Sequence, residues 1–362
     1  MVSIEPLNVL AGENIYVRNL GNYVTRLIRK VGIQYLENQL KQNRYFIYSW
    51  QQQGIPIRCT GELWKHYECF FHRRVSLHKA RYALPKSSNA LVLPDRMTPE
   101  LAYVTGYLIG DGTIASDLLR VEFYDASRDH LLHIASLIKR LFDLSDFKLS
   151  KDNIYNCYCL RYNSKLLALF FSKVMEIPIG KKKMKLKIPS QIDKPSFVKS
   201  FISGFTDAEG HVYYTPRLGY RVSIVQSSNI EFLSEIMVWL KHFRIDSEIK
   251  HHYRPHTHMI EIRRKDNVQK FLSCFDLKHP DKVERAHLLL RGLSTVRRTR
   301  LSQVKKDIIR HLQIPLTSLE LSEILMLKRK TIWLHLRELE NRNLIIADRS
   351  IYPIRWSAQK PP

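Results

Sequence analysis

The order of apolar and polar residues predicts a duplicated set of helices and β-hairpins through the middle of the chain. Apolar residues at helical spacing lead up to Asp111 in one segment and to Glu209 in another. Polar and apolar residues then alternate in residues 120–124 and 221–225, a pattern typical of strands with one buried and one polar face. We therefore predict an α+β fold in which two antiparallel sheets each pack one face against helices.

The two segments belong to an internal repeat. Gly106-Tyr107-Leu108-Ile109-Gly110-Asp111-Gly112 aligns with Gly204-Phe205-Thr206-Asp207-Ala208-Glu209-Gly210 at an offset of 98 residues, and the following strands align at 101. A hairpin turn can absorb the three-residue difference. In each repeat the pattern then predicts a helix, a second hairpin and a closing helix. The helix and hairpin cover residues 129–142 and 147–161 in the first repeat, and residues 231–243 and 247–264 in the second. Ser228 and Glu231 are expected to form a capping box at the second of these helices.

The flanking residues predict separate modules. A helix start at Thr98-Pro99-Glu100 follows one boundary, and a basic stretch at residues 297–300 marks another. Helical patterns over residues 23–40 and 45–53 indicate an N-terminal helix-turn-helix. We predict an N-terminal helical module, a first repeat, a second repeat and a C-terminal module, over residues 1–95, 96–195, 196–300 and 301–362.

The C-terminal module has its own local signals. Thr317 and Glu320 predict a capping box, and the basic turn Lys328-Arg329-Lys330 leads into a helix at residues 331–339. A short strand at residues 343–346 follows. This order resembles a winged helix-turn-helix, and a plain helical hairpin is the alternative.

Charge narrows the range of partners. The 362 residues carry a formal net charge of +24, divided as +8, +11 and +5 over residues 1–96, 97–300 and 301–362. A positive balance in every part favours a long polyanion, although a solvated basic surface would have the same composition. No apolar run approaches the ~18 residues of a membrane span, no signal peptide is evident, and the five cysteines are odd in number. We expect an intracellular protein, cytoplasmic or nucleoid-associated, or one placed in an organelle.

The repeated motifs also suggest a metal site. Gly106 with Gly110, and Gly204 with Ala208, put small residues one turn apart, so the two helices can pack closely. Such packing would bring Asp111 and Glu209 side by side, where two carboxylates repel unless a cation lies between them. Mg²⁺ (or Mn²⁺) suits these ligands. The alternative is two ordinary helices that each end in a solvated acid.

The motifs resemble those of the LAGLIDADG homing endonucleases in their single-chain, two-repeat form, over about residues 98–290. The resemblance implies a saddle of two sheets over double-stranded DNA, paired motif helices, and metal-dependent cleavage of both strands with short 3′ overhangs. It assigns the acidic metal ligands to Asp111 and Glu209. Gly110 and Ala208, directly before these acids, belong to the same predicted metal site. It also assigns the helix interface to Gly106, Gly110, Gly204 and Ala208.

Further catalytic candidates come from the same resemblance. Gln226 lies where the family usually has glutamine, whereas its first-repeat counterpart is Asp125. Lys282 matches the family's lysine in the second repeat. In the first repeat any residue of Lys181-Lys182-Lys183 fits, and we take Lys182 as the catalytic candidate of the three. A patch of lysines that only contacts phosphates is the alternative.

DNA contacts are expected from the polar strand faces and from the C-terminal module. The two repeats differ at most of these positions, so we expect an asymmetric target of about two helical turns. Neither the histidines of residues 251–258 nor Cys157 and Cys159 have zinc-site spacing. The DNA-binding candidates are Arg120, Glu122, Asp125, Arg161, Arg217, Arg221, Ser223, Lys250, Glu261, Arg263, Lys330 and Arg337.

The sequence thus predicts a monomeric, site-specific DNA endonuclease that uses a divalent metal. We expect a free-standing or intron-encoded protein rather than an intein. Two alternatives remain open: a DNA-binding regulator without cleavage activity, and a maturase that binds intron RNA.

Overall fold

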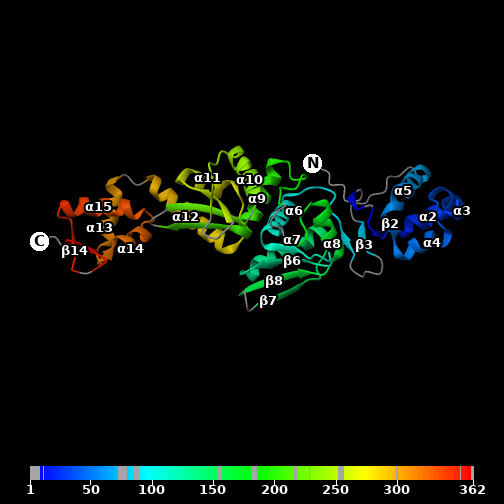
Figure 1. Cartoon of the computed structure of the whole chain (residues 1–362), viewed down its shortest axis with the longest axis horizontal. Helices are drawn as coiled ribbons and strands as arrows, with labels where there is room; N and C mark the ends of the chain where they lie inside the picture. Colours follow the sequence, from blue (N-terminus) through cyan, green and yellow to red (C-terminus); the bar gives the residue numbers. More distant parts are fainter. Residues whose placement is uncertain are drawn as a thin grey trace. The chain divides into compact units, whose positions relative to one another are not determined.

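The computed structural model describes residues 9–10, 12–71, 80–84, 90–152, 156–180, 186–215, 219–227, 229–251, 257–298, 301–350 and 352–359. The chain forms two compact units, Met1–Ala208 and Glu209–Pro362. Helices and antiparallel sheets alternate through both units, which confirms the α+β prediction (Figure 1). Among the described residues, no helix is long and apolar enough to cross a membrane.

The first unit begins with a helical module. Trp50, Leu27 and Ile47 are fully buried among its helices. The helical pattern predicted over residues 23–40 forms two helices, because Gly32 between them has a φ of +85°. The elements are β1 (Tyr16–Arg18), α2 (Gly21–Val31), α3 (Ile33–Leu40), α4 (Arg44–Gln53), β2 (Ile55–Pro56), α5 (Ile57–Phe71), β3 (Arg81–Ala83) and β4 (Leu91–Val92), with strand order β2-β1-β3-β4.

The first repeat follows in the same unit. Its motif helix begins as predicted, with the Thr98 side chain accepting a hydrogen bond from the Leu101 N–H at 3.2 Å and Pro99 in the first turn. The elements are α6 (Pro99–Asp111), β5 (Gly112–Ile114), β6 (Val121–Asp125), α7 (Arg128–Phe142), β7 (Lys148–Asp152), β8 (Cys157–Tyr162), α8 (Lys165–Leu169) and the π-helix η1 (Phe170–Val174). The sheet order is β5-β6-β8-β7.

The second repeat has the same strand order, β9-β10-β12-β11, so the duplication inferred from the sequence is present in the structure. Helices α10 and α11 cover the apolar face of its sheet, where Val222, Ile224 and Ile260 are fully buried (Figure 1). Its elements are α9 (Pro195–Glu209), β9 (Gly210–Thr215), β10 (Gly219–Ser227), α10 (Ile230–His242), β11 (Glu248–His251), β12 (Thr257–Ile262), α11 (Lys265–Cys274) and α12 (Pro280–Arg298).

The start of α10 differs from the prediction. Asn229 is the capping residue, and its side chain accepts a hydrogen bond from the Phe232 N–H at 2.8 Å. The predicted cap, Ser228, lies outside the described residues. Asparagine is at least as good a cap as serine, so the true cap is simply the next residue along the chain.

The C-terminal module contains the predicted helices and strand, together with two further strands. Thr317 and Glu320 form the predicted capping box. Leu321, Leu336 and Trp356 lie in its core. The elements are α13 (Leu301–His311), β13 (Leu316–Thr317), α14 (Ser318–Ile324), α15 (Arg329–Asn341), β14 (Ile345–Asp348) and β15 (Arg355–Ala358), with strand order β13-β15-β14.

This module should lose stability as the pH falls. Burial, followed by the positive charge of Lys305, lowers the pKa of His335 below its ordinary value. The unfolded chain therefore takes up a proton from about pH 6.5 downward before the folded chain does, and folding becomes less favourable. We expect the melting temperature of the full chain to fall between pH 7.5 and pH 5.5, and to fall less in His335→Gln. Equal pH dependence of the two proteins would contradict this assignment.

Candidate active site at the ends of two motif helices

Helices α6 and α9 pack with their backbones in contact inside the first unit. A Cβ atom added to Gly106 would lie 2.1 Å from the carbonyl oxygen of Phe201, and one added to Gly204 would lie 2.1 Å from that of Tyr103. The two contacts are reciprocal, as expected for duplicated helices related by a pseudo-two-fold axis. The close packing inferred from the motif glycines is therefore found at Gly106 and Gly204.

Each motif helix ends in an acid. Asp111 is the last residue of α6 and Glu209 the last residue of α9, and both side chains are half-buried. In each helix the acid comes five residues after the glycine at the crossing. The C-terminal end of a helix is negatively polarised, so a carboxylate there is disfavoured unless a cation accompanies it. Gly110 and Ala208, directly before the acids, add main-chain oxygens in the same last turns.

A buried carboxylate that the motif comparison missed lies two residues before the end of α9. Asp207 is 1% exposed and accepts a hydrogen bond of 2.6 Å from the Tyr103 hydroxyl on α6. That hydroxyl is also 3.5 Å from Nε2 of the buried His130 on α7. The available signal was an acid at the position where the first repeat has the apolar Ile109. The network ties α9 to α6 just before the acidic end of α9.

Asp125 takes part in a similar link in the first repeat. The Tyr107 hydroxyl on α6 donates to Asp125 Oδ2 at 2.6 Å, and the Ser127 N–H donates to Oδ1 at 2.7 Å. Burial, with the nearby Asp125 charge, raises the pKa of Tyr107 well above its ordinary value, so this hydroxyl stays a donor. Asp125 thus connects the motif helix to the start of α7.

The other catalytic candidates are spread over both units. Lys282 lies in the first turn of α12 and is half-buried; the helix begins at Pro280, since proline suits a first helical position. Gln226 lies in β10, opposite His258 in the strand register. Lys181-Lys182-Lys183 and Arg217 lie outside the described residues.

The predicted DNA-facing side of the first sheet is occupied by ion pairs. Glu122 on β6 lies opposite Arg161 on β8, whose Nε donates to Glu122 Oε1 at 2.6 Å. Arg120 Nε lies 3.6 Å from the same oxygen, and the Tyr124 hydroxyl donates to Oε2 at 2.7 Å. The hydrogen bond to Glu122 raises the pKa of the Arg161 guanidinium. The polar face is therefore a connected cluster rather than a row of separate side chains.

The second sheet has a corresponding cluster around Glu261 on β12. Arg263 Nε donates to Glu261 Oε2 at 2.7 Å, Lys250 Nζ lies 2.9 Å from that oxygen, and Arg221 pairs with Oε1. Arg263 also pairs with Glu248 at 2.9 Å. Burial, followed by the positive charge of Arg263, lowers the pKa of Arg221. Ser223, opposite Glu261 in the register, is buried as well.

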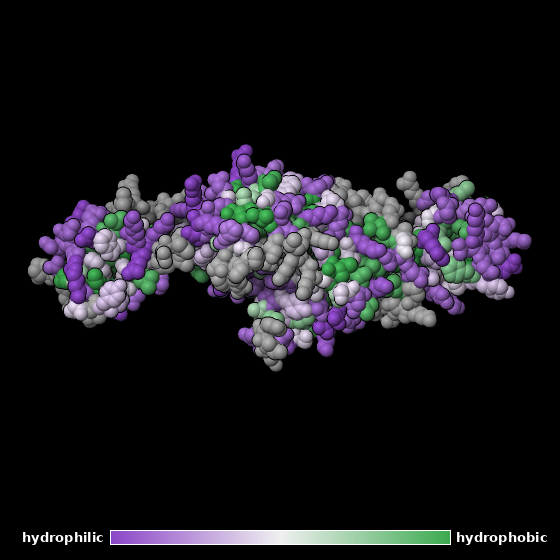
Figure 2. Space-filling view, in the orientation of Figure 1, coloured by the Kyte–Doolittle hydropathy of each residue, from purple (hydrophilic) through white to green (hydrophobic). Residues whose placement is uncertain are grey.

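The C-terminal module presents cationic and aromatic side chains on α15. Lys330, Trp333 and Arg337 are exposed, and the Arg337 guanidinium lies 4.6 Å from the centre of the Trp333 ring. Hydrophilic residues dominate the visible surface of this module (Figure 2). At this distance the guanidinium makes a cation–π contact with the ring.

Two tyrosines of the second repeat contact this module. The Tyr220 hydroxyl donates to the Met326 carbonyl at 2.9 Å, and the Tyr214 hydroxyl donates to the Ser322 carbonyl at 3.4 Å. The two rings pack together with centroids 5.0 Å apart. The β9–β10 hairpin therefore holds the turn between α14 and α15.

Other metal-binding or disulfide arrangements are not evident in the described part of the chain. None of its histidine, cysteine, aspartate and glutamate side chains form a group of three or more suited to a metal ion. All five cysteines are free.

Comparison with known proteins finds a family model that matches part of the chain. Residues 196–274 match the model of the LAGLIDADG-like domain. A glutamine–fructose-6-phosphate aminotransferase of Methanocaldococcus jannaschii is 28% identical over 254 residues, which are 68% of this chain and 21% of that protein. This chain therefore spans about a fifth of that relative.

Two solved structures are also similar. I-DmoI in complex with DNA and Ca is 22% identical with a TM-score of 0.39, and the match covers 52% of this chain and 97% of I-DmoI. Full-length WhiA from Thermatoga maritima is 16% identical with a TM-score of 0.36, covering 68% of this chain and 92% of WhiA.

Proposed function

We propose that this chain, whose residues 196–274 match the LAGLIDADG-like domain, is a site-specific DNA endonuclease that cleaves both strands with the help of a divalent metal. The observation that supports this proposal most strongly is the reciprocal glycine contact between α6 and α9. It aligns two helices that each end in a carboxylate, Asp111 and Glu209. Duplicated carboxylates suit a reaction carried out once on each DNA strand.

The chemistry of these residues fits Mg²⁺ or Mn²⁺. Carboxylates and main-chain carbonyls are hard oxygen ligands, which Asp111, Glu209, Gly110 and Ala208 supply at negatively polarised helix ends. A bound metal would lower the pKa of a water and stabilise charge on the phosphate. In each repeat a lysine, Lys182 in the first and Lys282 in the second, would stabilise negative charge on the scissile phosphate of one strand, and in the second repeat Gln226 would hold a water.

Duplex DNA is the substrate class that we propose. The net charge of +24 suits a long polyanion, and the two sheets each present cations on one face. A two-stranded ribbon can enter the major groove and contact base edges. The different side chains of the two repeats imply an asymmetric site, bound by one copy of the chain.

Cleavage of a randomised double-stranded DNA library tests the proposal. The full chain is incubated with the library with and without Mg²⁺, and both the cleaved and the bound DNA are sequenced. We expect one long asymmetric site that is cut on both strands only when metal is present. Metal-independent cutting, or the absence of any selected sequence, would contradict the proposal.

A DNA-binding regulator is the second candidate function. The exposed Lys330, Trp333 and Arg337 on α15 favour it, because this surface could bind DNA without using either motif acid. In the same library experiment a regulator would enrich a DNA sequence and leave it uncut. A chain that selects no DNA but binds intron RNA in a parallel binding assay would be a maturase instead.

The contacts of Tyr214 and Tyr220 should hold the C-terminal module where it can bind DNA that flanks the cleavage site. We expect Tyr214→Phe/Tyr220→Phe to lose about tenfold in affinity for a selected site with its flanks, since each hydrogen bond contributes about 0.5–1.5 kcal/mol. Affinity for the site trimmed of its flanks should not change. Fluorescence anisotropy with the two duplexes measures both values. Tyr45→Phe, at an exposed tyrosine of α4, is the control; equal losses on both duplexes would contradict the prediction.

A further inference from the structure

We propose that Glu122 and Glu261 are positioning residues, each of which holds basic side chains in a fixed arrangement for reading guanine bases. This inference rests on the proposed binding of duplex DNA, and it assigns to the two acids a role other than direct contact with bases. The two clusters lie in different repeats.

The two carboxylates are buried, whereas one arginine partner of each, Arg161 and Arg263, is partly exposed. The side chains of Glu122 and Glu261 are 8% and 3% exposed. Arg161 and Arg263, their hydrogen-bonding partners, are 36% and 39% exposed. The acids therefore cannot reach the base edges of a bound duplex. The guanidinium groups can, because each has five N–H donors and spends only some of them on its glutamate.

Each cluster keeps an excess of positive charge. Glu122 is shared by Arg120 and Arg161. Around Glu261 the cations Arg221, Lys250 and Arg263 outnumber the acids Glu261 and Glu248 by one. In each cluster the glutamate holds the cations in place, and the net charge stays positive. Such a surface suits a polyanion that has hydrogen-bond acceptors at defined positions.

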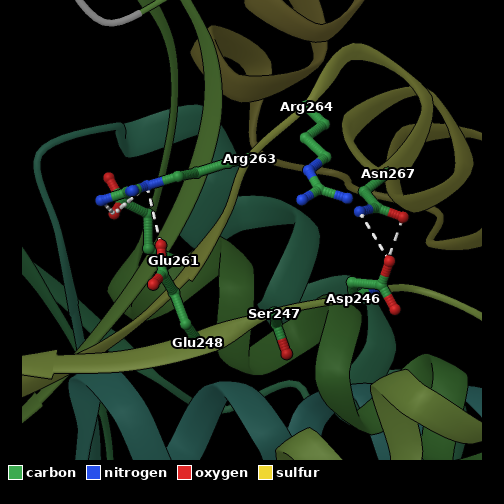
Figure 3. Close-up of a pocket in the computed structure, with 7 residues that line it drawn as sticks. All are labelled: Asp246, Ser247, Glu248, Glu261, Arg263, Arg264 and Asn267. Atoms are coloured by element: carbon green, nitrogen blue, oxygen red, sulfur yellow. Dashed lines mark hydrogen bonds and ion pairs between the residues drawn. The ribbon is translucent and has the colours of Figure 1, made fainter.

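The cavity beside the second cluster shows how Arg263 is held (Figure 3). It has a volume of about 410 Å³ and lies between β11 and the start of α11. Arg263 is directed toward Glu248 and Glu261, while Arg264 lies on the side of Asn267. Its lining residues are Asp246, Ser247, Glu248, Glu261, Arg263, Arg264 and Asn267.

Stability alone does not account for a buried acid in both sheets. A buried ion pair is often no better than a hydrophobic pair of similar volume, because both charges lose their hydration. A planar guanidinium held by a carboxylate is, however, pre-organised for two hydrogen bonds to guanine O6 and N7. Fixed arginines therefore improve the discrimination between bases more than the general attraction to phosphates.

The two repeats place the acid on different strands. In the first sheet Glu122 on β6 lies opposite Arg161 on β8, and in the second sheet Ser223 on β10 lies opposite Glu261 on β12. The acid has thus moved to the equivalent of the Arg161 position, and the cations lie around it differently. The guanines recognised by the two repeats must therefore lie at different positions in the two halves of the site. This makes the proposed target more asymmetric.

Binding selections with matched variants test the inference. We expect Glu261→Gln to reduce discrimination for guanine about 5- to 100-fold in one half of the selected site, and Glu122→Gln to do so in the other half. Affinity for unrelated DNA should stay the same or rise, since each change adds one positive charge. Glu37→Gln removes an acid that pairs with Arg44 in the N-terminal module, and should alter neither half.

The outcomes separate this inference from the proposed function. A wild-type chain that selects no DNA overturns both. A wild type that selects a site, with variants that keep its guanine preferences or lose specificity equally in both halves, overturns only the positioning role. If Glu261→Gln does not fold, Arg263→Gln removes an exposed cation of the same cluster and must relax the same half of the site.

Discussion

Asp111→Asn and Glu209→Gln are each expected to slow double-strand cleavage by at least about 1000-fold, the loss typical when a group that acts in the transition state is removed. Either change removes the charge that would hold the metal while it keeps the shape of the side chain. Binding of the selected DNA in the absence of metal should change by less than about threefold, because one acid at a helix end contributes little to phosphate attraction. Single-turnover cleavage and anisotropy measure the two quantities separately.

Asp117→Asn is the matched control for this pair. Asp117 is an exposed acid in the turn before β6, and its carboxylate accepts a hydrogen bond from the Leu119 N–H. The same loss of one negative charge there should leave cleavage unchanged. A variant at Asp111 or Glu209 that still cuts both strands at the wild-type rate would remove that residue from the proposed mechanism.

Gly106→Ala and Gly204→Ala are each expected to lower the free energy of unfolding by at least about 3 kcal/mol, toward the upper end of the cost of overpacking. The added methyl group would lie 2.1 Å from a main-chain carbonyl oxygen of the facing helix. A backbone oxygen cannot turn aside as a flexible side chain can, so α6 and α9 must separate and lose packing along their length. Urea denaturation of the full chain measures the change.

Gly61→Ala provides the opposite expectation in another helix. Nothing lies within 4 Å of a Cβ atom added to Gly61 in α5. Alanine favours a helix over glycine by up to about 1 kcal/mol, so this variant should be as stable as the wild type or slightly more so. If Gly106→Ala were equally well tolerated, the close contact between α6 and α9 would not exist in solution.

Local signals in the sequence predicted the elements well. The cap at Thr98 and the capping box of Thr317 with Glu320 were found at the predicted residues, because each depends on hydrogen bonds within one turn of helix. The repeat offset predicted the duplication, and the structure has the same strand order in both sheets, since the same pattern of apolar residues folds in the same way twice. Gly32 was missed, because apolar periodicity continues across the break.

The sequence by itself determined the α+β class, the duplication and the two motif helices, because periodicity, caps and small residues act over a few neighbouring positions. Only the tertiary structure decided which polar side chains are buried and which are exposed to solvent. Tyr103 and Asp207 are 104 residues apart in the sequence, and Glu122 and Arg161 are 39 residues apart. No local pattern therefore indicates that either acid is buried. Only the strand register and the helix crossing bring such partners together, and a carboxylate is buried where cations or hydroxyl groups meet it.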